Sequence, residues 1–270
     1  MTPPPTPTKK ESLAAVLERL SLNQSVTGVL VIGSLAAGTI NAASDYDLVI
    51  LLNTAPRPWF VGVTTIDNRP TDLIFVAATA VQAVAALAAP VSQNHELAPV
   101  IRWLSAGAIR FDRQGDLGRL QQKLKQGEWI EAIDDKAGYD AWFAINYNLA
   151  VAERLAKSED DLYRHAALIR MGVYGHTDIW FGYFAIRKQP WAGDKAAVSY
   201  LLAHDEIFLA TFQRFLAAST ITEKLRLYRQ AAELATAPHG GLWSPGVAVM
   251  NDDRAKTLWQ ELMGSLNSAG

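Results

Sequence analysis

Residues 29–52 read VLVIGSLAAGTINAASDYDLVILL and decide the fold of this 270-residue chain. The apolar run Val29 to Ile32 predicts a strand that ends at Gly33, where the missing Cβ allows a sharp backbone turn. We expect Ser34 to cap the short helix that follows and to leave backbone N–H groups facing a phosphate. The stretch therefore predicts a strand, a phosphate-binding turn and a second strand.

Two acidic residues lie on the second predicted strand. Asp45 and Asp47 are two residues apart, so both carboxylates point to the same face of the sheet. Close carboxylates repel each other unless a positive charge lies between them. Mg²⁺ is commonly held by one or two carboxylates together with substrate phosphates. A phosphate-binding turn beside such a pair is what nucleotidyl transfer requires.

This pattern resembles the signature of the nucleotidyltransferase superfamily with the DNA polymerase β-type fold, which is glycine-serine, a spacer, and then Asp-x-Asp. The family carries a third carboxylate on a neighbouring strand, and Asp72 in the run TDLIFV fits that place. The resemblance implies two Mg²⁺ ions held by acidic residues, with Asp72 also able to accept the proton of a hydroxyl. The residues it implies are Asp45, Asp47 and Asp72 for catalysis and metal, and Gly33, Ser34 and Ser44 for nucleotide.

Bacterial members that modify aminoglycosides and lincosamides pair this domain with a helical C-terminal half, as this chain is expected to do. The resemblance implies transfer of NMP, most often AMP, from Mg-NTP to a hydroxyl of a small acceptor. Many members carry a basic residue where this chain has Ala37. Lys195, in the predicted loop 189–195, could replace that charge at the triphosphate, or it could be an ordinary surface lysine.

The whole chain predicts an α+β protein. Residues 1–8 are a proline-rich tail, residues 9–127 a nucleotidyltransferase domain with a mixed sheet flanked by helices, and residues 128–270 an all-α helical bundle. Strands are expected at 60–66 and 72–76 around a turn at 67–70, and Arg69 in that turn is expected to be solvated.

The helical half shows apolar residues at helical spacing over several segments. Asp205 and Thr222 are interpreted as helix caps or early helix residues, and the aromatic residues between 180 and 184 as core. The predicted helices are 130–157, 160–188, 193–204, 205–218 and 220–236.

Composition narrows the possible partners. A net charge of −2 disfavours an extended nucleic-acid partner and a template-reading polymerase. The chain has no cysteine, which fits a reducing cytoplasm, and the alanine- and valine-rich stretch 77–91 is too short to span a membrane. We expect a cytoplasmic protein whose partners are NTP and a small acceptor, with a homodimer possible.

Three other functions stay open. The chain could adenylylate a protein, as an antitoxin-like partner modifier does. It could be a nucleotide-binding module with weak catalysis, which the alanine at position 37 favours. Arg170 and His176 also resemble the ribonuclease motif of HEPN domains, but Met171 stands where that motif has a polar residue, and the motif is short.

Overall fold

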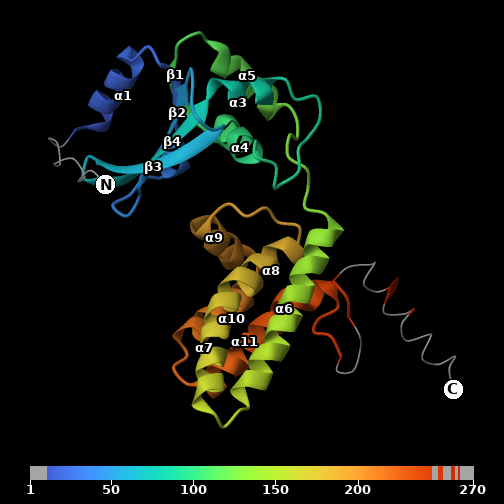
Figure 1. Ribbon diagram of the computed structural model, residues 1–270. Coiled ribbons are helices and arrows are strands. Elements are labelled where there is room, and N and C mark those ends of the chain that lie inside the picture. Colours follow the sequence, from blue (N-terminus) through green and yellow to red (C-terminus); the bar gives the residue numbers. More distant parts are fainter. Residues whose placement is uncertain (1–10, 245–248, 252–256, 259–260, 262–270) are drawn as a thin grey trace. The chain divides into compact units, whose positions relative to one another are not determined.

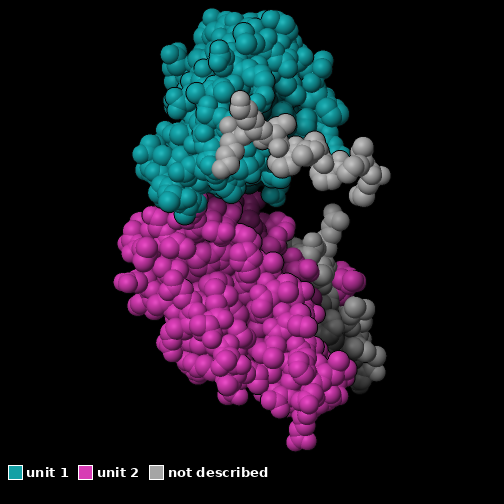
Figure 2. Space-filling model, turned by 90° about the vertical axis from the view of Figure 1, so that its left-hand side faces the viewer, with its two compact units in different colours: residues 1–132 teal, residues 133–270 magenta. Residues whose placement is uncertain are grey.

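The computed structural model describes residues 11–244, 249–251, 257–258 and 261. The predicted tail 1–8 lies outside these residues. The chain divides into two compact units, residues 1–132 and 133–270, coloured separately in Figure 2. The first contains a mixed sheet flanked by helices and the second is built from helices, so the predicted α+β fold class is confirmed.

The sheet of the first unit has five strands in the order β3-β4-β2-β1-β5. β2 and β4 pair in parallel and the other neighbouring strands pair antiparallel. This arrangement places the strand with Asp47 between β1 and the strand with Asp72. The strands are β1 (Val26–Ile32), β2 (Tyr46–Leu52), β3 (Trp59–Ile66), β4 (Arg69–Ala77) and β5 (Ala108–Asp112).

Each face of the sheet has its own hydrophobic core. Leu48 and Ile50 of β2 pack toward α1 (Leu13–Leu22), whereas Val49 and Leu51 pack toward the opposite cluster. That second cluster is covered by α3 (Ala78–Ala85), α4 (Ala98–Ala106) and α5 (Asp116–Lys125), and Figure 1 shows α1 apart from these three helices. Because side chains alternate along a strand, Asp47 points to the same face as Val49.

The hairpin between β3 and β4 corrects one prediction. Asp67 and Asn68 both have positive φ, 52° and 61°, and form a two-residue turn, so β4 already begins at Arg69. Arg69 is not solvated as predicted. Its Nη1 donates to the carbonyls of Asn41 at 2.6 Å and Ser44 at 2.7 Å.

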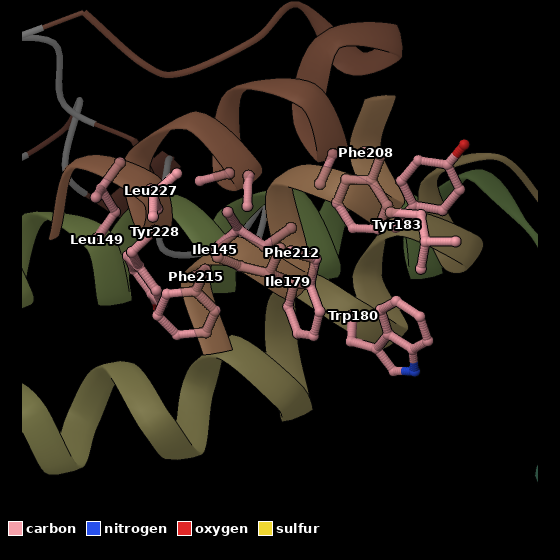
Figure 3. Packing of buried hydrophobic residues seen from close by; sticks show 14 of the residues in the cluster. Ile145, Leu149, Ile179, Trp180, Tyr183, Phe208, Phe212, Phe215, Leu227 and Tyr228 are labelled. Carbon is pink, nitrogen blue, oxygen red and sulfur yellow. The ribbon is translucent and has the colours of Figure 1, made fainter. Parts of the chain in front are cut away.

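The second unit is a helical bundle around an aromatic core, part of which is shown in Figure 3. Asp205 caps a helix as predicted, since its side chain accepts from the Phe208 N–H. Thr222 is an early helix residue as predicted, in the first turn of the next helix, whose N-cap is Thr220. Trp180, Tyr183 and Phe184 are buried in the core, as expected. The helices are α6 (Asp135–Ala156), α7 (Asp161–Tyr174), α8 (Phe181–Ile186), α9 (Asp194–His204), α10 (Glu206–Ala217) and α11 (Ile221–Thr236).

The segment predicted as one helix over 160–188 contains an irregularity. Between α7 and α8 the backbone forms a π-helix, η1 (Gly175–Trp180). Within the described ranges, no helix combines the length and the apolar character needed to cross a membrane.

Candidate active site

Two of the predicted acidic residues meet on one face of the sheet. Asp47 of β2 is the register partner of Asp72 on β4 and of Ile32 on β1. Register partners on neighbouring strands point to the same side, about 5 Å apart along the hydrogen-bonding direction. Both carboxylates are half-buried, so they are accessible to a ligand. The fold therefore places two oxygen donors side by side near the beginning of β2 and β4.

The turn after β1 lies directly against this acidic pair. Gly33 has a φ of 63°, and a Cβ built on it would lie only 2.5 Å from Asp47 Oδ2. Only glycine avoids both the strained backbone and the clash at this position. The sequence motif thus has a physical reason, because the Asp47 carboxylate occupies the space that a side chain at position 33 would need.

Ser34 does not cap the helix as predicted. It lies in the first turn of α2 (Gly33–Ala37), whose N-cap is Ile32, and no side chain caps this helix. The Ser34 hydroxyl is buried and finds no hydrogen-bond partner in the described part of the chain. A buried hydroxyl without a partner costs free energy unless a ligand or water supplies one. It is next to Gly33 in the sequence, at the turn where nucleotide is expected.

Asp45 follows a loop, residues 41–44, that is closed by two hydrogen bonds and leads into β2. The Asn41 N–H donates to Ser44 Oγ at 3.0 Å, and the Ser44 N–H donates to the Asn41 carbonyl at 3.1 Å. Arg69 clamps the same two residues, and its guanidinium lies 5.7 Å from the centre of the Tyr46 ring. The predicted nucleotide contact Ser44 is buried and uses its hydroxyl inside this loop. Sequence reasoning missed Arg69 as the residue that positions the loop.

The other predicted features are placed as follows. Ala37 is exposed at the end of α2, and Lys195 is exposed in the first turn of α9 in the helical unit. Within the described residues, no group of three or more His, Cys, Asp or Glu side chains is arranged to hold a metal ion. The structure brings Asp47 and Asp72 into register and places Asp45 one residue before β2.

The chain was compared with protein families, curated proteins and solved structures. No protein-family profile matches the chain, and no curated protein matches it. One solved structure similar to it is a nucleotidyltransferase-like protein from Exiguobacterium sibiricum 255-15, with 11% identity, a TM-score of 0.40, and coverage of 84% of this chain and 74% of that chain. At these values the similarity assigns neither a family nor an activity.

Proposed function

We propose that the chain is a metal-dependent nucleotidyltransferase that moves NMP, most often AMP, from Mg-NTP to a hydroxyl of a small acceptor. The observation that carries this proposal is the register of Asp47 with Asp72, together with the approach of Asp47 Oδ2 to Gly33. Paired carboxylates beside a tight turn suit a divalent ion and a polyphosphate. A structural role alone would not favour two neighbouring acids that repel each other.

The donor set fits Mg²⁺, which prefers oxygen ligands. Because no three described acidic side chains form a metal site by themselves, Asp45, Asp47 and Asp72 would hold two ions only together with phosphate oxygens of the NTP. Bound Mg²⁺ would neutralise triphosphate charge and make the acceptor hydroxyl more acidic. Asp72 would accept the proton of that hydroxyl. The unpartnered Ser34 hydroxyl and the backbone of Gly33 would contact phosphate oxygens, with Ser44 shaping the same loop. Lys195 is proposed as the cation that replaces a basic residue at position 37.

The proposed acceptor is a hydroxyl of an antibiotic. Sequence resemblance to antibiotic-modifying members and the presence of a helical unit after the sheet both favour an aminoglycoside or lincosamide hydroxyl. An assay with acceptors of both classes distinguishes them.

The test is transfer of labelled NMP from each α-phosphate-labelled NTP to a panel of aminoglycosides and lincosamides. We expect Mg²⁺-dependent labelling by the wild-type chain and loss of at least a hundredfold in Asp47→Asn. Asp116→Asn is the matched control, because Asp116 is an exposed acid of the same unit that pairs with Arg119 on α5. Full activity in Asp47→Asn would refute the assignment of metal ligands.

A nucleotide-binding module with weak catalysis is the second candidate. It is favoured by the uncharged Ala37 at the end of α2 and by the lack of a three-residue metal group among the described side chains. Such a module would bind Mg-ATP in a calorimetric titration without transferring label to any acceptor.

A further inference from the structure

The strand β3 forms one edge of the sheet, because it pairs with β4 on one side only (Figure 1). It has eight residues, and its register with β4 runs without a bulge from Trp59 to Ile66. Its sequence, WFVGVTTI, contains no charged residue and no proline. Proteins usually protect an edge strand by short length, charge, proline or a bulge, and β3 has none of these features.

The opposite edge of the same sheet is protected. β5 has only five residues, and its register with β1 shifts between Val29 and Leu30. The exposed Arg110 lies at its centre. A long charged side chain and a bulge both hinder the addition of another strand. The two edges therefore differ, since β5 carries features that oppose pairing and β3 does not.

The outward-facing backbone groups of β3 belong to alternate residues. The two-residue turn makes Ile66 and Arg69 a hydrogen-bonded pair, and at the other end the Ala77 N–H donates to the Pro58 carbonyl at 2.9 Å. Even-numbered residues of β3 therefore bond to β4. The N–H and C=O groups of the odd-numbered residues point away from the sheet, and no other described element hydrogen-bonds to them. These residues are Trp59, Val61, Val63 and Thr65.

Two exposed apolar side chains lie along the middle of this edge. Val61 is 51% exposed and Val63 is 80% exposed. Val63 is the register partner of Asp72, so both valines lie on the face of the sheet that carries the acidic pair. Removal of this apolar surface from water would favour the addition of a strand at this edge.

We propose that β3 pairs antiparallel with β3 of a second copy of this chain, so that the two sheets join into one. The two-fold axis passes at Gly62, and Val61 then lies opposite the partner's Val63. All outward-facing residues of one copy meet outward-facing residues of the other, and each such pair exchanges two hydrogen bonds. A shift by one residue would oppose them to groups already bonded to β4, so the register can change only in steps of two.

Charge favours this register and a second copy as the occupant. Arg57 lies just before β3, is exposed, and has no hydrogen bond or ion pair to another described residue. Asp67 lies just after β3 and is also exposed, and its carboxylate uses only Oδ2 in hydrogen bonds within the described chain. In the register around Gly62, Arg57 comes next to the partner's Asp67, and the two-fold axis repeats this pair at the other end.

The N-terminal residues 1–10 of the same chain are the alternative occupant of this edge. Four prolines lie among residues 3–7 of that segment, and proline has no N–H to donate to a strand ladder. The β3 sequence has an N–H at every position and brings no like charges together when it pairs with itself. A second copy is therefore the better partner.

The dimer does not depend on the proposed transferase activity, and the mass of the full chain in solution tests it. Light scattering after size exclusion should give twice the mass of one chain at about 100 μM and a concentration-dependent decrease on dilution. Amide exchange measured by NMR should slow with protein concentration at Val61 and Val63, whose N–H groups point outward. It should not change at Phe60 and Gly62, whose N–H groups bond to β4.

Two variants test the interface. Val63→Pro removes an outward N–H and keeps the β3–β4 hydrogen bonds, so the dissociation constant should rise at least tenfold while circular dichroism stays unchanged. Val63→Thr is its control, because it keeps the N–H and the branched side chain. Arg57→Glu places two acids side by side and should also weaken the dimer at least tenfold. Arg110→Glu makes the same change of charge on β5 and should leave the dimer intact.

A chain that stays monomeric at every concentration overturns the proposal, and this is the result expected if residues 1–10 cover the edge. A dimer that Val63→Pro and Arg57→Glu leave as tight as the wild type also overturns it, because such a dimer uses another surface. If Val63→Pro does not fold, Arg57→Glu and the alternating exchange pattern decide the outcome.

Discussion

Replacing Gly33 with alanine tests the close approach between the turn and the acidic pair. The substitution adds a Cβ to a residue whose backbone has the left-handed conformation, which destabilises the folded state by about 1–2 kcal/mol. The same Cβ would lie 2.5 Å from Asp47 Oδ2, so the carboxylate must leave its rotamer at a further cost of about 0.5–1.5 kcal/mol. We therefore expect Gly33→Ala to lower the free energy of unfolding by about 1.5–3.5 kcal/mol.

Gly38→Ala is a matched control at the other end of α2, where Gly38 is the C-cap. Gly38 has a φ of 71°, but an added Cβ would meet nothing within 4 Å, so this variant bears the backbone strain without the clash. Urea unfolding of both variants, followed by circular dichroism, gives the two free energies. Calorimetric titration with Mg-ATP shows whether displacement of the Asp47 carboxylate lowers the affinity of the protein for the nucleotide. Equal stability loss and equal Mg-ATP affinity in the two variants would refute the reasoning.

Further predictions follow from individual contacts. Arg69→Gln should speed hydrogen exchange in residues 41–45 and lower stability by about 1–3 kcal/mol, since two charge-assisted hydrogen bonds are lost; unchanged exchange would contradict the clamp. Ser34→Ala should leave the melting temperature unchanged or higher because its hydroxyl has no partner in the described chain, yet weaken Mg-ATP binding in calorimetry. Burial and the hydrogen bond to Asp205 raise the pKa of Tyr183, so folding stability should be intact below pH 10 and fall above it. Tyr183→Phe should reduce that alkaline loss in a series of urea titrations.

The strands around the acidic pair could be predicted because each local feature of their sequence favours the same structure, a strand that ends at a glycine turn. Apolar runs, a glycine turn and the parity of Asp47 relative to Val49 indicate a half-buried strand with its acids on one side. Asp72 and Asp47 become register partners because β4 pairs in parallel with β2, and these two strands are not adjacent in the sequence. Sequence resemblance supplied that pairing, because spacing along one strand says nothing about register with another.

The sequence around Arg69 contains a pattern that indicates its position in β4, but the prediction placed Arg69 in the turn. Asp-Asn between two apolar runs suits a two-residue turn with both residues at positive φ, which starts the next strand at Arg69. The predicted turn was two residues too long and placed this arginine in solvent. Its true partners are carbonyls of a loop far away in the sequence, so no local pattern could have identified them.

Several buried polar atoms of the helical unit, Asn148 Oδ1, Arg170 Nε and Tyr228 Oη, lack a hydrogen-bond partner within the described residues, and the sequence could not predict this. Asn148, Arg170 and Tyr228 come from three helices and each has the spacing of an ordinary helical residue. The sequence singles out Arg170 only as part of a short motif with His176, which is exposed and packs edge-to-face against Phe181. Hydrogen-bonding atoms without partners appear only when tertiary packing is known.

The most direct measurement is a calorimetric titration of Mg-ATP into the wild-type chain, Asp72→Asn and the control Asp116→Asn. Asp72 lies in register with Asp47, whereas Asp116 is an exposed residue of α5. We predict Mg²⁺-dependent binding by the wild type and the control, and at least tenfold weaker binding by Asp72→Asn. Equal affinity in all three proteins, or binding that does not depend on Mg²⁺, would contradict a metal-nucleotide site at this acidic pair.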